Sequence, residues 1–148
     1  RGTAELPPDP TGRSAGLETP AARVQAAREK GVENLSFDDD GNAEVRGRVV
    51  GAQNDFYAVV GEAGDNLSVT LEPGNRALYF EVLRTRNDSS MFQAGDSGVH
   101  HWKGGLPADE TYLIRVYLYP SAVRYNERSD YTLRINLQPP TLGGKPRR

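Results

Sequence analysis

Residues 106–136 of this chain read LPADETYLIRVYLYPSAVRYNERSDYTLRIN. Tyr112, Ile114, Val116 and Leu118 alternate with the residues at 113, 115 and 117, which is the period of a β-strand. The same period returns over 131–136 and predicts a second strand. Residues 119–130 between them are mostly polar, and loops held by a rigid sheet are frequent binding sites. The stretch therefore predicts a scaffold of strands that presents a long loop.

The rest of the chain predicts further short strands, separated by turns rich in Gly, Pro, Asn and Asp. The turn signals recur about every 8 to 12 residues, which is typical of β-sandwiches. The sequence thus predicts an all-β fold, an antiparallel and jelly-roll-like β-sandwich of about eight or nine strands. The expected strands lie at residues 35–37, 43–50, 55–60, 67–71, 78–82, 91–93, 99–103, 112–118 and 131–136.

The N-terminal part of the chain differs from the rest. Residues 1–18 contain three prolines, three glycines and no apolar period, which predicts a disordered arm. Thr19 can cap a helix, Pro20 suits its first position and Gly31 can end it. The apolar stripe of this short helix is thin, so we expect the helix to pack on the edge of the sandwich. The predicted organisation is an arm at 1–18, one domain at 19–138 and a tail at 139–148.

The composition excludes several classes of function. The chain has no cysteine, so it holds no disulfide, thiol nucleophile or cysteine-ligated metal. It has no run of roughly 18 apolar residues that could span a membrane. Because the chain begins at Arg1 rather than at methionine, we expect that a signal peptide was removed and that the protein is periplasmic or extracellular.

The charge is unevenly distributed along the chain. The formal net charge is −2, but residues 32–141 contain 16 acidic and 10 basic side chains. An acidic domain does not suit nucleic acid, which requires a basic surface. It would suit a basic protein partner, whereas the alternative is that the surplus carboxylates only keep the domain soluble.

Two short motifs invite a catalytic or metal-binding interpretation. Residues 95–98, Gly-Asp-Ser-Gly, match the sequence around the nucleophile of chymotrypsin-like proteases. The chain is too short for two barrels and its only histidines lie three and four residues after the serine, so a glycine-rich turn is favoured. His100 and His101 would point to opposite faces of a strand, with no third histidine to complete a metal site. We therefore expect no enzymatic activity, no catalytic residue, no metal and no cofactor.

A cluster of oxygen-bearing side chains surrounds Gly41, formed by Asp38, Asp40, Asn42 and Glu44. Calcium loops use such alternate spacing, but the full loop that ends in a bidentate Glu is absent. The favoured alternative is a β-hairpin in which the glycine supplies a positive φ angle.

Two sets of residues resemble one known family. The C-terminal signature of the bacterial inhibitors of g-type (goose-type) lysozyme is similar to the motifs Leu106-Pro-Ala-Asp109, Tyr112, Arg115-Val-Tyr-Leu118, Ala122-Val-Arg124, Asn126-Glu127 and Tyr131-Thr-Leu133. A second set follows in the order of that family, with Gly51, Asp55, Tyr57, Gly64 and the strand at 67–71. More broadly, the chain resembles the pre-peptidase C-terminal-like β-sandwich domains of secreted bacterial proteins. The resemblance covers roughly residues 32 to 138.

The resemblance implies that the loop plugs the active-site groove of a g-type lysozyme. Arg124 would pair with a carboxyl group in the groove, while Tyr119 and Tyr125 would exclude water. The other implied contacts are Asn126 in the loop and a second patch formed by Tyr57 and Asp55.

The loop departs from the family pattern at one position. Inhibitors of this type tend to have two arginines here, four residues apart, and Pro120 stands in place of the first. Arg115 and Tyr117 on the preceding strand are candidates to compensate for that missing charge.

Structural roles are the alternatives for the same residues. Arg124 could form an ion pair with Glu127 or Asp130 that only pins the loop. Tyr57 alternates with other residues along a strand, which is more typical of a core aromatic.

Three further aromatic residues also need an assignment. Tyr112 and Tyr131 are expected in the core, with hydroxyl groups that reach the backbone. Trp102 is suited either to the core or, if exposed, to binding a sugar. The alternative function is therefore an accessory or carbohydrate-binding module of the pre-peptidase C-terminal-like kind.

Overall fold

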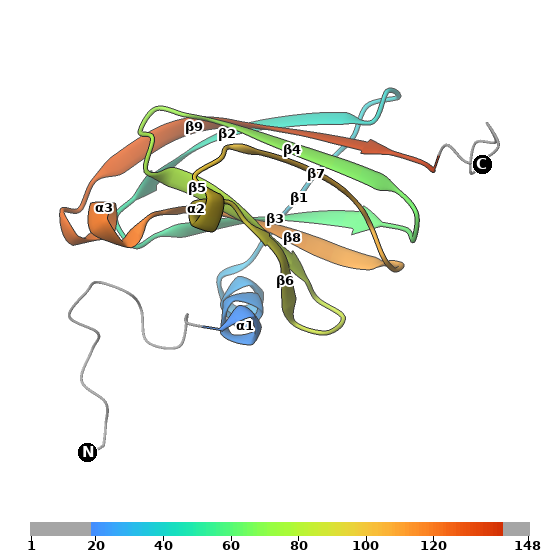
Figure 1. Ribbon diagram of the computed structural model, residues 1–148, viewed down its shortest axis with the longest axis horizontal. Coiled ribbons are helices and arrows are strands. Elements are labelled where there is room, and N and C mark those ends of the chain that lie inside the picture. Colours follow the sequence, from blue (N-terminus) through green and yellow to red (C-terminus); the bar gives the residue numbers. More distant parts are fainter. Residues whose placement is uncertain (1–18, 141–148) are drawn as a thin grey trace, which may run out of the picture.

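The computed structural model describes residues 19–140, except for the side chains of residues 96 and 97. Its strands form two sheets that pack face to face (Figure 1). The five-stranded sheet has the order β1 (Glu33–Asn34), β3 (Asn54–Gly61), β8 (Glu110–Leu118), β5 (Leu78–Arg84) and β6 (Ser89–Gln93). The four-stranded sheet has the order β2 (Asn42–Val50), β9 (Arg128–Gln138), β4 (Asn66–Pro73) and β7 (His101–Gly105).

The predicted all-β sandwich is confirmed. Every neighbouring pair of strands is antiparallel except β1 with β3. The predicted arm at 1–18 and residues 141–148 of the predicted tail lie outside the described residues. None of the helices within residues 19–140 is long and apolar enough to cross a membrane.

The core lies between the two sheets. In β4 and β9, buried and more exposed residues alternate, as expected for a sheet with one solvated face. Leu67, Val69 and Leu133 point inward from this sheet, and Phe80 and Ile114 meet them from the other sheet, all five fully buried. The alternation read from the sequence therefore marks the inner face of the four-stranded sheet correctly.

Strand β8 behaves differently because it is covered on both faces. All of residues 112–118 are buried, so the outward positions Leu113, Arg115 and Tyr117 are shielded from water as well. Its inner face packs on the four-stranded sheet, and its outer face lies under the helix α1 (Pro20–Lys30). The sequence pattern alone indicated strand periodicity but not this second layer.

The predicted N-terminal helix is confirmed as α1, but its predicted position at the edge of the sandwich is wrong. The Thr19 side chain accepts a hydrogen bond from the Ala22 backbone N–H at 3.1 Å. Val24 and Ala27 pack against apolar side chains on the outer face of the five-stranded sheet, namely Phe56, Ala58, Leu83 and Leu113. The helix thus lies across β3, β8 and β5 rather than beside them (Figure 1).

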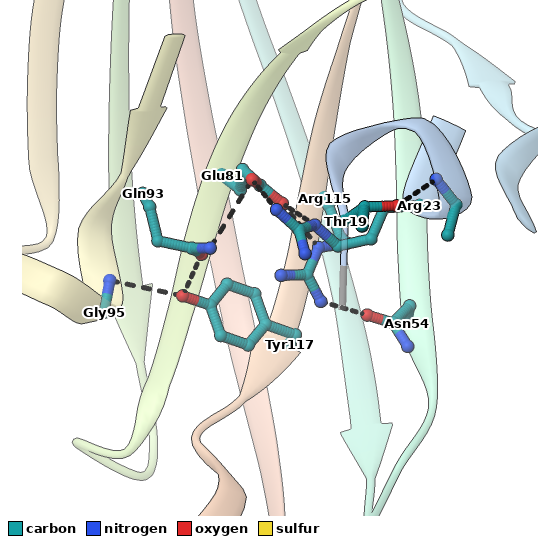
Figure 2. A network of polar contacts seen from close by, with 9 residues as sticks. Thr19, Arg23, Asn54, Glu81, Gln93, Gly95, Arg115 and Tyr117 are labelled. Carbon is teal, nitrogen blue, oxygen red and sulfur yellow. Dashed lines mark hydrogen bonds and ion pairs between the residues drawn. The ribbon is translucent and has the colours of Figure 1, made fainter. Parts of the chain in front are cut away.

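A buried ion cluster lies under α1 (Figure 2). Glu81 on β5 is fully buried, and its carboxylate accepts hydrogen bonds from Nε and Nη2 of Arg23, both at 2.8 Å. Nε of Arg115 on β8 donates to the same carboxylate at 2.9 Å. Burial lowers the pKa of Arg115, while the charge of Glu81 opposes that effect. One carboxylate therefore joins the helix to two central strands.

The cluster continues into neighbouring strands through polar contacts (Figure 2). Arg115 donates to the side-chain oxygen of Asn54 on β3 at 2.7 Å, and its guanidinium lies 3.9 Å from the ring centroid of Tyr117. The Tyr117 hydroxyl donates to Gln93 on β6 at 2.5 Å and accepts from the Gly95 backbone N–H at 3.2 Å. The network thereby links four strands of one sheet.

The predicted β-hairpin around Gly41 is wrong. Residues 35–41 form no strand; they cross from β1 in one sheet to β2 in the other, with Leu35 and Phe37 half-buried against the core. The Asp38 carboxylate accepts from the backbone N–H groups of Asp40 and Asn42, both at 2.9 Å, which stabilises the turn. The predicted glycine at positive φ is present, since φ of Gly41 is 82°. Burial of Leu35 and Phe37 against the sandwich favours the crossing over local pairing.

We expect Glu81→Gln to destabilise the fold by about 3 to 5 kcal/mol, because it leaves two buried guanidinium groups without a counter-charge. Glu44→Gln is the matched control, since Glu44 pairs with arginine on an exposed face and should change stability by less than about 1 kcal/mol. Chemical denaturation of both variants measures this difference. Equal stability of the two variants would contradict a structural role for the cluster.

Candidate functional site

The predicted loop between β8 and β9 contains a short helix, α3 (Pro120–Arg124). Pro120 occupies the first helical position, where its fixed φ angle fits and its missing N–H costs nothing. Ala122 is buried against the core, and Asn126 closes the turn with a positive φ of 52°. The loop is therefore folded rather than irregular, which the sequence analysis did not predict.

Two turns, at Gly51 and at residues 75–77, hold this loop in place through three hydrogen bonds. The backbone N–H of Tyr119 donates to the Ala77 carbonyl at 2.8 Å. The backbone N–H of Gly51 donates to the Glu127 carbonyl, also at 2.8 Å. The side-chain amide of Asn75 donates to the Glu127 carboxylate at 2.8 Å. The loop thus sits on the turns that follow β2 and β4, at one end of the sandwich (Figure 1).

The four residues expected to bind a partner in this loop are all exposed. Tyr125 is 77% exposed and Tyr119 is 44% exposed, both high values for large aromatic side chains. Arg124 and Asn126 are exposed as well. The structure therefore brings Tyr119, Arg124, Tyr125 and Asn126 together on one short segment of surface.

The alternative role of Arg124 in a structural ion pair is not realised. Its side chain forms no ion pair or hydrogen bond with any residue in the range 19–140. Asp130 pairs instead with Arg48 at 2.7 Å, and this hydrogen bond and charge hold the pKa of Asp130 below its usual value. Glu127 accepts from Asn75. Arg124 therefore keeps its donors available at the surface.

Two aromatic residues that the sequence analysis did not select adjoin the loop. The ring of Tyr79 meets that of Tyr119 edge-on, with centroids 6.0 Å apart. The His100 ring stacks on Tyr79 with centroids 4.8 Å apart, and its Nε2 lies 2.9 Å from the Leu78 carbonyl oxygen. No local pattern marks these two residues, because the three rings come from separate segments of the chain.

The predicted second patch lies mostly inside the protein. Tyr57 is only 5% exposed, so the structure places it in the core, and its hydroxyl lies 2.5 Å from that of Tyr131. The Tyr131 hydroxyl donates to the half-buried carboxylate of Asp55, also at 2.5 Å. Gly47 faces this pair, where an added Cβ would lie 2.5 Å from the Tyr131 hydroxyl. Asp55 and Tyr57 therefore join the two sheets near the end that bears α3.

The burial of three other side chains decides the roles that the sequence suggested for them. Arg115 is buried in the ion cluster and Tyr117 is buried against its guanidinium, so their predicted compensation for Pro120 at the loop is wrong. Trp102 is half-buried and stacks on Phe92 with centroids 5.9 Å apart, so it is not an exposed sugar platform.

The expected core assignments of two tyrosines are confirmed. Tyr112 is fully buried and its hydroxyl reaches the Ala108 backbone, and Tyr131 is 4% exposed. The hydroxyl of Tyr131, however, bonds side chains rather than the expected backbone.

The two short motifs lie in α2 (Ala94–Ser97) and at the start of β7 (His101–Gly105). Residues 95–98, predicted as a turn, lie in the short helix α2 (Ala94–Ser97) and the left-handed Gly98 that ends it. His101 turns away from His100 and its Nδ1 lies 2.8 Å from the Thr70 hydroxyl. Within the described part of the chain, no three His, Cys, Asp or Glu side chains gather where they could hold a metal ion.

The geometry defines a β-sandwich that presents an arginine and two tyrosines on an anchored loop, and solved structures of similar fold exist. Neither a protein-family model nor a curated protein sequence matches the chain. PliG of Aeromonas hydrophila, a periplasmic inhibitor of g-type lysozyme, matches with a TM-score of 0.64 and 24% identity over 72% of this chain and 96% of that one. PliG of Salmonella Typhimurium matches with a TM-score of 0.59 and 19% identity over 73% of this chain and 100% of that one.

The pre-peptidase C-terminal domain of a Bacillus anthracis collagenase is also similar, with a TM-score of 0.49 and 18% identity over 72% of this chain and 95% of that domain. The resemblance stated from the sequence motifs is thus confirmed for the fold. The chain is a β-sandwich similar to the periplasmic inhibitors of g-type lysozyme.

The buried tyrosines predict how stability falls at high pH. Burial and the hydrogen bonds to Asp55 and Tyr57 raise the pKa of Tyr131 well above its usual value, and burial also raises the pKa of Tyr57. The folded state then holds these protons more tightly than the unfolded chain. Their stabilisation is complete below the unfolded pKa of about 10 and is lost as the pH rises above it.

We expect Tyr131→Phe to make this alkaline decline shallower by about 1.4 kcal/mol per pH unit, because one such proton is removed. Denaturant unfolding at a series of pH values above about 10 measures the slope. A slope identical to that of the unmodified protein would contradict the argument.

Proposed function

We propose that this protein is a periplasmic or extracellular inhibitor of g-type lysozyme that blocks the enzyme's substrate groove with the α3 loop. The single observation that supports this proposal is Arg124, exposed between Tyr119 and Tyr125 and without an ion pair to any of residues 19–140. The similarity in fold to the PliG inhibitors supplies the kind of partner.

The chemistry of the loop suits a carboxylate inside a groove. A guanidinium can donate two parallel hydrogen bonds to a carboxylate, and glycoside hydrolases use carboxyl groups for catalysis. Arg124 breaks no internal ion pair when it binds, so its attraction is not offset by such a loss. Tyr119 and Tyr125 would cover the pair from water, which strengthens a charge-assisted hydrogen bond.

The anchored backbone favours binding as well. Tyr119, Gly51 and Asn75 fix both ends of the loop, so little conformational entropy remains to be lost on association. The acidic surplus of residues 32–141 would attract a basic enzyme over a distance. The loop would supply specificity, and the acidic surface would raise the association rate.

Titration of purified g-type, c-type and i-type lysozymes with this protein tests the proposal. We expect inhibition of the g-type enzyme and no inhibition of the other two. Inhibition of none of the three would overturn the proposal and leave only the fold similarity, in which case an accessory role in a secreted protein is the next candidate.

We expect Arg124→Ala to weaken binding to g-type lysozyme by about 2 kcal/mol or more while leaving the melting temperature unchanged, because the side chain has no ion pair or hydrogen bond to any of residues 19–140. Arg46→Ala is the control, since Arg46 is also an exposed arginine but lies on the outer face of the four-stranded sheet, where it forms only a surface ion pair with Glu44 at 3.4 Å. Inhibition assays and thermal unfolding measure both variants. A parallel loss of stability in the first variant, or equal inhibition by both, would exclude the proposed contact.

Pro120→Arg tests the departure from the family pattern. Position 120 precedes Arg124 by one helical turn, so an arginine there would lie on the same side of α3. We expect this variant to tighten inhibition about tenfold, the effect of one added hydrogen bond to a charged group. Pro120→Ala is the control for loss of the proline ring, and equal affinity of the two variants would contradict the expectation.

A further inference from the structure

A polar hollow lies on the outer face of the four-stranded sheet. It has a volume of about 420 Å³, within the range of about 300 to 1,000 Å³ typical of small-molecule sites. Strands β2, β4 and β9 form its floor. Helix α1 covers the other sheet, so it leaves this face open (Figure 1).

The strand register arranges the lining side chains in two rows. Asn42, Asn136 and Ser68 lie side by side across β2, β9 and β4. Glu44, Arg134 and Thr70 form the next row, two residues further along each strand. Because adjacent strands are about 4.8 Å apart, each row sets three polar groups at a regular spacing.

Some of these groups have unused capacity for hydrogen bonds. Asn136 donates to the Asn42 side-chain oxygen at 2.7 Å, which leaves the Asn42 amide N–H and the Asn136 oxygen without a partner among residues 19–140. The Ser68 hydroxyl also has no partner within that range. One donor, one acceptor and one hydroxyl group therefore lie within a single row.

The second row is fixed by ion pairs. Nε of Arg134 donates to Glu44 at 3.2 Å, and its Nη1 pairs with Glu72 on β4. The arginine is thus held between two carboxylates, which fixes its position at the rim of the hollow. A ligand would meet a site that is already formed.

The charge and chemistry of the lining indicate the class of ligand. Arg134 stands beside Asp38 and Glu44, so the hollow offers no excess of positive charge for a phosphate or nucleic acid. It contains no exposed aromatic side chain, which disfavours a protein partner. Sugar hydroxyl groups both donate and accept, and so they match alternating amides, hydroxyls and carboxylates.

We propose that this hollow binds a short neutral oligosaccharide, independently of the α3 loop. The first row, Asn42, Asn136 and Ser68, hydrogen-bonds the sugar hydroxyl groups, and Arg134 and Glu44 bound the ring on one side. The site differs from a platform at Trp102, whose ring is half-buried against Phe92.

The test is an NMR titration of the labelled protein with chitotriose, cellotriose and maltotriose. We expect at least one of them to shift backbone amide signals of β2, β4 and β9 around the hollow, with no shifts in α3. Asn136→Ala should weaken that binding at least about tenfold, because it removes one hydrogen-bonding side chain and leaves the Asn42 oxygen without its donor. Ser68→Gln, which fills the hollow while leaving the asparagine pair intact, should weaken it similarly.

The matched control is Arg48→Gln, on the same face of β2 but paired with Asp130 outside the hollow. It should bind the oligosaccharide as the unmodified protein does. No shift with any of the three sugars, shifts confined to α3, or equal binding by the Ser68→Gln variant would each overturn the proposal. Lysozyme inhibition by these variants should be unchanged, so failure here and failure of the proposed inhibitory function can be told apart.

Discussion

The burial of Glu81 between two arginines is the constraint on which the outer layer of this protein depends. Helix α1 buries only Val24 and Ala27 as apolar anchors, too little to hold a short helix on a sheet by the hydrophobic effect alone. Arg23 adds a bidentate contact with a carboxylate that is inaccessible to water. Removing Glu81 would leave two desolvated guanidinium groups without a counter-charge, whereas removing either arginine would leave one ion pair and an unfilled position beside the carboxylate.

Two guanidinium groups around one carboxylate leave an excess positive charge, and neighbouring polar and aromatic groups stabilise that charge. The ring face of Tyr117 lies against Arg115, and the Asn54 side-chain oxygen accepts a hydrogen bond from the Arg115 guanidinium. Replacing Arg115 with lysine would lose interactions, because a planar guanidinium can bond a carboxylate and an amide oxygen while its face stacks on an aromatic ring. The cluster therefore specifies where α1 docks as well as stabilising it.

The candidate binding loop lies between two such polar networks. On one side, Tyr117 bonds Gly95 in α2, near the stacked rings of Tyr79 and His100. On the other, Asp55 and Tyr131 tie β3 to β9 close to where the loop ends. Polar bonds inside a sandwich have a fixed geometry that apolar packing does not impose. This gives a physical reason why the exposed loop is held at a defined angle.

Local patterns in the sequence predict the strands and the helix α1 well, because alternation and caps depend on near neighbours. The position of α1 was not predictable in this way, since Arg23 and Glu81 are 58 residues apart and each looks like an ordinary surface residue. Alternation along its strand did favour a core position for Tyr57, but no local pattern could indicate its bond to Tyr131 on the facing sheet. Whether Arg124 would form an internal ion pair could not be decided locally either, because its candidate partner Asp130 pairs with Arg48 on β2, which is distant in the sequence.

The two candidate surfaces lie at opposite ends of the same sheet. Strand β2 begins at Asn42 beside the hollow and ends at Val50, one residue before Gly51 bonds the α3 loop. At about 3.3 Å per residue, the seven steps from Glu44 to Gly51 span about 23 Å. A short ligand in the hollow therefore would not touch the loop directly, and the paired strands β2 and β9 lie between the two sites. The fold thus permits a protein partner at one end and a sugar on the open face at the same time.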